Sequence, residues 1–222
     1  MTEPTFRAVA ERAVLVAFGD RIAVEVHAQV VRLDRLLAAH PVPGMVEVTP
    51  AYANLLVSFD PLVTDHAGVI AAVRQVLAGP EVGGAAAKTH RIGVCYDADL
   101  GTDLAVVAER TGLSAEAVIA AHLAGDYRVY LYGFAPGYAY LAGTPPALHL
   151  PRKPAAVRDI PAGRVIIAGP QCIVTTLKMP TGWWIIGASP DRILQEGPEP
   201  FRFAVGDFVK FHRISRAGHD AV

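Results

Sequence analysis

The chain reads YRVYLYGFAPGYAYLAGTPPALHLPRKPAAVRDIPAGRVIIAGPQCIVTTLKMPTGWWIIGASP from Tyr127 to Pro190, and this stretch decides its fold. Glycines, prolines, aromatic residues and isolated basic residues alternate there with short β-branched runs. Glycine and proline fix backbone conformations that other residues adopt only with strain, and loops held by rigid strands commonly carry binding residues. The stretch therefore indicates a site built on loops.

Strand-like runs extend through this stretch and beyond it, separated by Pro/Gly turns, as in a β-barrel or sandwich. They are residues 128–132, 164–167, 173–177, 183–186 and 208–214. A strand at 90–96 precedes them, followed by helices at 103–110 and 115–123, for which Thr102 and Ser114 are the expected N-caps. We expect the tail, residues 215–222, to be frayed.

The N-terminal part has a different pattern. Strands are expected at 13–18, 45–49 and 54–59, with a helix after the expected N-cap Asp20 and a second helix at 65–77. The order β-α-β-β-α predicts an α+β, ferredoxin-like domain. Glycine-rich residues near 78–89 predict a linker, which gives an N-terminal domain at 1–80, a linker at 81–89 and a barrel domain at 90–222.

Composition narrows the class of protein. The 222 residues carry a formal net charge of -1, so no overall field draws the chain to nucleic acid. No apolar run reaches the roughly 18 residues of a membrane span and the N-terminus lacks a signal pattern, so we expect a cytoplasmic protein. Cys95 and Cys172 lie in apparent strands, far apart and without a metal-ligand pattern, which predicts reduced core thiols.

Several motifs together resemble one family. They are LSAEAVIAAH (113–122), GFAPGYAYLAG (133–143), PRKP (151–154), R-x-x-PAG (158–163), IAGPQ (167–171) and PTGWWIIG (180–187). In this order and spacing they are similar to the allophanate hydrolase subunit 1 family, which includes the B subunit of 5-oxoprolinase, a sporulation histidine-kinase inhibitor and part of urea carboxylase. The resemblance covers essentially the whole chain. The sequence departs from the usual pattern at Pro170, Thr175, Thr176 and Lys178, near the expected pocket.

The resemblance implies a ferredoxin-like domain followed by a cyclophilin-like β-barrel. It also implies a subunit of an ATP-dependent 5-oxoprolinase that opens the lactam of 5-oxo-L-proline to give L-glutamate. The implied partners are a second cyclophilin-like subunit, of the allophanate hydrolase subunit 2 type, and a third, LamB/YcsF-like subunit. The sequence shows no familiar phosphate-binding loop or metal motif, so we expect ATP to bind at least partly on a partner and the chain to be inactive alone.

Four polar residues are candidates for the site. His122, at a helix end, fits a general acid/base, although such a histidine also interacts with the helix dipole. Arg152 and Arg158 lie among prolines and fit a carboxylate, Arg158 in a catalytic role and Arg152 in substrate binding; a basic rim is the alternative. Gln171 fits an amide edge or a buried backbone group.

Aromatic and loop residues complete the expected site. Tyr130, Phe134, Pro136 and Gly137 are assigned to substrate binding, the last two as residues that shape the loop. Aromatic residues in this stretch are also typical of a core or a subunit interface. Tyr138, Tyr140, Trp183 and Trp184 are interpreted in that second way.

Two other functions stay open on the sequence. One is an allophanate hydrolase or urea carboxylase-like subunit that acts on another amide or urea. The other is a regulatory protein that inhibits a histidine kinase through an apolar surface and needs no reactive residue.

Overall fold

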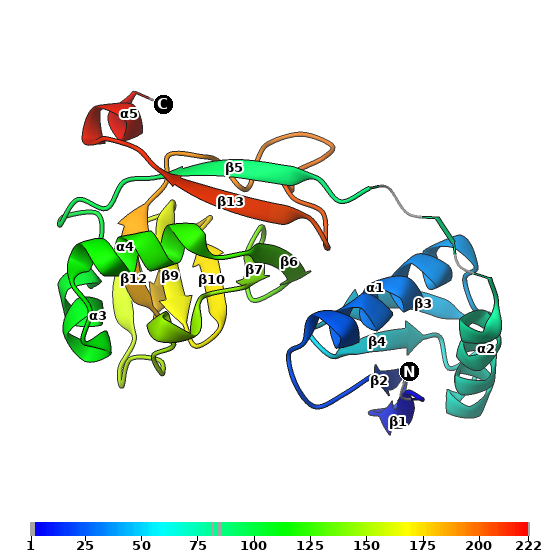
Figure 1. Cartoon of the computed structure of the whole chain (residues 1–222). Coiled ribbons are helices and arrows are strands. Elements are labelled where there is room, and N and C mark those ends of the chain that lie inside the picture. The colour runs from blue at the N-terminus through cyan, green and yellow to red at the C-terminus, as the bar shows by residue number, and fades with distance from the viewer. Residues whose placement is uncertain (1–2, 81, 84–85, 222) are drawn as a thin grey trace. The chain divides into compact units, whose positions relative to one another are not determined.

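The computed structural model describes residues 3–80, 82–83 and 86–221, and the chain divides into two compact units, Met1–Ala86 and Ala87–Val222 (Figure 1). Residues 81, 84 and 85 of the predicted linker lie outside the described residues. Within the described part, no helix is long and apolar enough to cross a membrane.

The first unit is a four-stranded antiparallel sheet with two helices. Its elements are β1 (Thr5–Val9), β2 (Ala13–Ala17), α1 (Val24–Ala39), β3 (Met45–Pro50), β4 (Asn54–Phe59) and α2 (His66–Ala78), and the strand order is β1-β2-β4-β3. Alternate residues of β2 and β4, such as Val14 and Leu55, are buried against apolar residues of both helices. The predicted β-α-β-β-α order is confirmed, with β1 as an additional edge strand.

The second unit is built on a seven-stranded sheet that is nearly closed. Its elements are β5 (Thr89–Val94), α3 (Leu104–Thr111), α4 (Ala115–Ala124), β6 (Tyr127–Tyr132), β7 (Ala139–Ala142), η1 (Pro146–Leu148), β8 (Val157–Ile160), β9 (Arg164–Ala168), β10 (Gln171–Val174), β11 (Met179–Thr181), β12 (Trp184–Ala188), β13 (Phe208–Arg213) and α5 (Arg216–Asp220). The strand order is β12-β9-β10-β7-β6-β13-β5, antiparallel except for the β13 and β5 pair. Cys95, directly after β5, and Ala188, at the end of β12, exchange two backbone hydrogen bonds of 2.8 and 2.9 Å. These bonds connect the two edge strands of the sheet.

The two faces of this sheet have different neighbours. One face, which we call the core face, contributes residues such as Val165, Cys172 and Trp184 to the main core with α3 and α4. The opposite face, which we call the outer face, contributes Ile166 and Ile173 to a smaller cluster with the two-stranded β8 and β11 sheet. Because side chains alternate along a strand, neighbouring residues of β9 and β10 belong to different environments.

Two predicted helix caps are wrong. Asp20 lies four residues before Val24, too far to reach the first-turn amides of α1, and Ala23 occupies the N-cap without a side-chain cap bond. Asp103, not Thr102, precedes α3, and its carboxylate accepts a hydrogen bond from the Ile185 amide instead of capping the helix. Ser114, the cap predicted for α4, accepts a backbone N–H bond, and so does Asp65, which caps α2 although the sequence analysis placed it inside that helix.

The prediction of a frayed tail is also wrong. Ser215 caps α5 through Gly218, and Arg216 pairs with Asp220 in the same helix and with Asp99 in the loop after β5. These charged contacts hold the short helix against the barrel, although its sequence has no apolar stripe that would predict packing. Both cysteines, Cys95 and Cys172, are free and buried, so their predicted place in the core is confirmed.

Candidate functional site

The loop between β6 and β7, residues 133–138, is held in an unusual conformation. Phe134 has φ +67° and Gly137 has φ +73°, both in the left-handed region. A Cβ at Gly137 would lie 2.9 Å from the Leu194 Cβ, so only glycine fits there without a shift. The Thr176 hydroxyl donates a 2.6 Å hydrogen bond to the Pro136 carbonyl and fixes the loop on the end of β10.

A small hollow lies beside this loop on the outer face of the sheet. Its volume is about 110 Å³. We call it the Arg152 pocket, and its lining consists of Phe134, Tyr138, Tyr140, Arg152, Ile166, Ile173, Pro180, Thr181, Gly182 and Trp183. The aromatic rings contact one another at their edges, with Phe134 5.6 Å from Tyr138 and Tyr140 5.9 Å from Trp183 between ring centroids. The pocket is therefore a largely aromatic recess with one cationic side chain.

Arg152 and Lys153 are neighbours in the chain but have opposite environments. The Lys153 ammonium pairs with Asp103 at 2.5 Å, and the two side chains are only 9% and 18% exposed. The Arg152 guanidinium lies 5.6 Å from the ring centroid of Trp183, and no carboxylate among the described residues pairs with it. Arg152 is thus exposed, available to an anion, and positioned by an aromatic ring.

The tyrosines of the pocket stay protonated at neutral pH. Burial raises the pKa of Tyr138 and of Tyr140, and for Tyr140 the charge of Arg152 opposes that rise. Both hydroxyls therefore keep the proton that a hydrogen-bond donor needs. Among the described residues that line the pocket, none is a carboxylate, histidine or cysteine, and its hydroxyl groups are those of Tyr138, Tyr140 and Thr181.

His122 lies on the core face, away from this pocket. It is fully buried in α4, its Nδ1 is hydrogen-bonded to the Tyr96 hydroxyl at 2.7 Å, and its Nε2 is 3.7 Å from the Cys172 sulfur. Its ring packs 4.6 Å from that of Phe211. Burial lowers the pKa of His122 to about 3, so the imidazole is neutral at physiological pH.

The sheet itself separates His122 from Arg152. Cys172 of β10 contacts His122 on the core face, whereas the next residue, Ile173, lines the Arg152 pocket on the outer face. A substrate held by Arg152 therefore lies on the other side of a strand from His122. The contacts favour a structural role for His122, and its predicted catalytic role would require a ligand to enter the core.

The other predicted residues are spread over the barrel. Tyr130 is buried in β6, Gln171 is half-buried in β10 opposite Ala168, and Arg158 is exposed on β8. None of these three lines the Arg152 pocket. Of the eight predicted site residues, the structure brings Phe134 and Arg152 together in one pocket, with Pro136 and Gly137 in the loop that carries Phe134.

Sequence reasoning interpreted Tyr138, Tyr140 and Trp183 as core or interface residues. They line the pocket while also packing in the outer-face cluster. The alternation Tyr138, Ala139, Tyr140, Leu141 was a usable signal, because it places both tyrosines on one face of a strand and the small and aliphatic residues on the other. That strand, β7, was not predicted.

The fold and the pocket define a class of protein: a mixed α+β chain whose larger unit is a nearly closed barrel with a small aromatic recess. A family model described as carboxyltransferase domain, subdomain C and D, matches residues 4–203, and the chain belongs to this family.

Relatives in bacteria are similar over nearly their full length. The chain is 34% identical over 227 residues to the B subunit of 5-oxoprolinase from Bacillus subtilis, with 95% of this chain and 93% of that protein covered. It is 32% identical to the corresponding B subunit from Escherichia coli O157:H7, over 91% of this chain and 93% of the relative.

Solved structures show the same fold within longer chains. TTHA0988 superposes with a TM-score of 0.81 at 35% identity, covering 92% of this chain but only 40% of its own. Urea amidolyase of Kluyveromyces lactis superposes with a TM-score of 0.82 over 99% of this chain and 15% of its own. At 13% identity, this second likeness concerns the fold alone.

Proposed function

We propose that this chain is a subunit of an ATP-dependent 5-oxoprolinase complex that opens the lactam of 5-oxo-L-proline to L-glutamate. Relatives named as the B subunit of 5-oxoprolinase, at 29–34% identity over most of the chain, support this proposal. The word subunit in these names supports the further proposal that the chain acts within a complex. We propose a second cyclophilin-like subunit and a LamB/YcsF-like subunit as its partners.

The observation that carries the proposal is the unpaired Arg152 at an aromatic recess. 5-Oxoproline is a small, flat ring with one carboxylate, and arginine binds carboxylates through two parallel N–H bonds. The Arg152 guanidinium would bind that carboxylate, while Trp183 and Phe134 offer apolar faces to the ring. The Tyr138 hydroxyl would donate a hydrogen bond to the lactam carbonyl oxygen.

The same pocket supports a composite site. Its volume of about 110 Å³ is below the roughly 300–1,000 Å³ of sites that enclose a drug-sized ligand, and a nucleotide does not fit in it. A lactam carbonyl is a poor electrophile, and ATP would supply the activation. We therefore assign nucleotide binding at least partly to a partner subunit, and substrate binding partly to this chain.

Two finer features of the fold are also proposals. We propose that the first unit is a ferredoxin-like variant in which β1 is the strand beside β2, and that the barrel is of the cyclophilin-like type. The domain limits of 1–80 and 90–222 and the cytoplasmic location stay predictions.

The experiment is 5-oxoproline-dependent ATP hydrolysis and glutamate release by the chain alone and by the complex formed with its genomic-neighbour subunits. We expect activity only in the complex. The Arg152→Ala variant should raise KM for 5-oxoproline by about 30-fold or more, because a charged bidentate contact contributes about 2 to 3 kcal/mol. Arg152→Lys should recover part of the loss.

Two further arginine variants serve as comparisons. Arg91→Ala removes an exposed arginine of β5 that does not line the pocket and should leave KM unchanged. Arg158→Ala tests the other predicted arginine. Absence of turnover in a well-formed complex would remove 5-oxoproline as the substrate, and normal KM in Arg152→Ala would remove this pocket from the site.

A further inference from the structure

A second and larger hollow lies at one end of the barrel. Its volume is about 450 Å³, within the range of sites that hold small-molecule ligands. It is formed where β9 begins and where β10 and β12 end, by residues 162–163, 175–176 and 189–194, with His219 of α5. We call it the barrel-end pocket. It shares no lining residue with the Arg152 pocket.

The walls of this pocket are fixed by short-range contacts. Gly163 has φ +83°, and a Cβ there would lie 2.6 Å from the Ser189 carbonyl oxygen, so two wall segments approach closely. The Thr175 hydroxyl donates to the Pro161 carbonyl and accepts from the Arg164 amide. The hollow is therefore preformed, which reduces the entropy that a ligand must overcome on binding.

The acidic residue in the lining is already neutralised. One oxygen of Asp191 pairs with Arg202 at 2.7 Å, and the other accepts a 2.9 Å hydrogen bond from the Gly93 amide. The Ser189 hydroxyl is 3.4 Å from that second oxygen. Asp191 thus supports the loop and leaves little negative charge for the pocket.

The basic residue beside it has no such partner. Arg192 is exposed in the lining, and no acidic group among the described residues pairs with it. Of these two successive residues, Asp191 is paired within the protein, whereas Arg192 lines the hollow and can bind a ligand. The lining contains one acidic and one basic side chain, and because Asp191 is paired with Arg202, Arg192 stays available to a ligand. The Thr176 and Ser189 hydroxyls already donate within the protein, to the Pro136 carbonyl and to Asp191.

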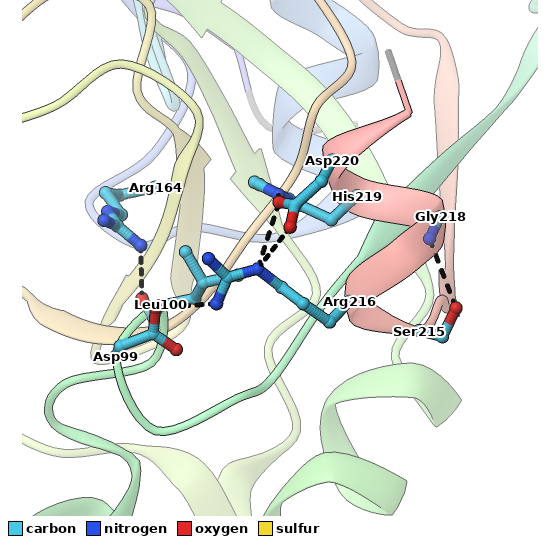
Figure 2. A network of polar contacts seen from close by, with 8 residues as sticks. All are labelled: Asp99, Leu100, Arg164, Ser215, Arg216, Gly218, His219 and Asp220. Atoms are coloured by element: carbon cyan, nitrogen blue, oxygen red, sulfur yellow. Dashed lines mark hydrogen bonds and ion pairs between the residues drawn. The ribbon is translucent and has the colours of Figure 1, made fainter.

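The C-terminal helix, α5, contributes another part of the wall. His219 lines the pocket, and its Nδ1 lies 2.9 Å from the Asp220 carboxylate, which leaves Nε2 as the ring nitrogen available to a ligand. Arg216 holds this helix by donating to Asp220 and to Asp99, as Figure 2 shows. Arg164 donates to the Leu100 carbonyl in the same loop as Asp99.

We propose that the barrel-end pocket is a second binding site, for a small ligand that carries a carboxylate or phosphate group. Arg192 binds the oxyanion, the His219 ring in its imidazolium form donates to it from Nε2, and Arg216 positions His219 through α5. This site is independent of the proposed function, because it uses none of the residues of the Arg152 pocket.

The test is a titration of the full chain with inorganic phosphate and, separately, with L-glutamate, followed by amide chemical shifts. Saturable shifts at residues 162–163, 175–176, 189–194 and 216–220 are expected with at least one probe, and the probe that binds there more tightly identifies the anion. Arg192→Ala should weaken that binding about tenfold or more, since it removes a charge-assisted contact.

Three variants separate the proposal from general electrostatics. His219→Ala should weaken binding by about three- to tenfold, and Arg216→Ala by less, because it acts only through α5. Arg91→Ala, at an exposed position of β5 that lines neither pocket, should bind as the unchanged chain does. Absence of saturable shifts with both probes would overturn the proposal, as would equal weakening by Arg91→Ala and Arg192→Ala.

Discussion

The core face and the outer face of the barrel sheet use the same strands for different purposes. On the core face, Cys172 of β10 contacts His122, which is buried and is also hydrogen-bonded to the Tyr96 hydroxyl. On the outer face, Ile173 lies under a recess in which an arginine has no acidic partner among the described residues. The comparison teaches that a histidine or arginine in a motif does not by itself identify a binding site. Whether a ligand can reach the side chain depends on which face of the sheet it contacts.

The largest loss of stability is expected when the His122 side chain is removed from the core. His122→Ala should reduce the free energy of unfolding by about 4 kcal/mol, since it leaves a cavity and removes the partner of the Tyr96 hydroxyl. Urea unfolding followed by circular dichroism measures it. The exposed His40→Ala is the control and should change stability by about 0.5 kcal/mol or less. A small loss for His122→Ala would mean that this side chain is not structural.

The second-largest loss of stability is expected when the ion pair between Lys153 and Asp103 is removed. Lys153→Ala leaves the Asp103 carboxylate, only 18% exposed, without its partner, which should cost about 2 to 3 kcal/mol in unfolding free energy. Lys178→Ala is the matched control, because the Lys178 and Asp159 pair is 66% and 78% exposed and should contribute about 0.5 kcal/mol. Equal losses in the two variants would contradict the contrast between buried and exposed pairs.

Acid should destabilise the chain through His122. Its pKa is about 3 in the folded chain and about 6.5 in the unfolded one, so the unfolded chain binds the additional proton between these values. The contribution of neutral His122 to the free energy of unfolding is therefore complete above pH 6.5 and is lost as the pH falls below that value. The loss is about 1.4 kcal/mol per pH unit, which amounts to about 2 kcal/mol at pH 5.

The His122→Gln variant isolates this titration, because an amide can still bond to Tyr96 but does not take up a proton near neutral pH. Unfolding free energies of the two proteins at pH 7 and pH 5 give the comparison. The same slope in both would show that His122 is not the group responsible.

The smallest effect is expected on the outer face. Arg152→Ala should change the free energy of unfolding by only about 0.5 kcal/mol, since it removes an exposed contact with the Trp183 ring. A loss near that of Lys153→Ala would show that Arg152 is structural. Together with the expected rise in KM, an unchanged stability would mark Arg152 as a residue that serves binding.

Much of the fold could be predicted from local patterns. The helices with side-chain caps at Asp65 and Ser114, and strands such as 54–59 and 164–168, are apolar segments bounded by turn or capping residues, and lie close to their predicted bounds. Short strands such as β8, at 157–160, were missed because its sequence VRDI is mostly exposed and shows no buried stripe. Such strands are held by pairing with distant residues, which a local window does not contain.

The site was harder to predict than the fold. The stretch 127–190 correctly indicated a loop-built region, and Phe134 and Arg152 do meet there. Part of the barrel-end pocket also lies in that stretch, including Thr175 and Thr176, but Arg192 and His219 lie outside it, in segments without a glycine-rich motif, and were not predicted. The polar tail was expected to be free, whereas Arg216 binds it to the barrel through a charged contact with Asp99.

The sequence by itself determined the order of the longer helices and strands, the family and the region of the chain that builds loops, because these depend on apolar runs, turn residues and motif spacing. Only the tertiary structure decided which polar residues are available. His122 meets Tyr96 and Cys172, which are 26 and 50 residues away along the chain, and these contacts remove it from solvent. Arg152 remains available while Lys153 does not, because only Lys153 reaches Asp103. Such long-range pairings set burial and charge, and residue type alone does not reveal them.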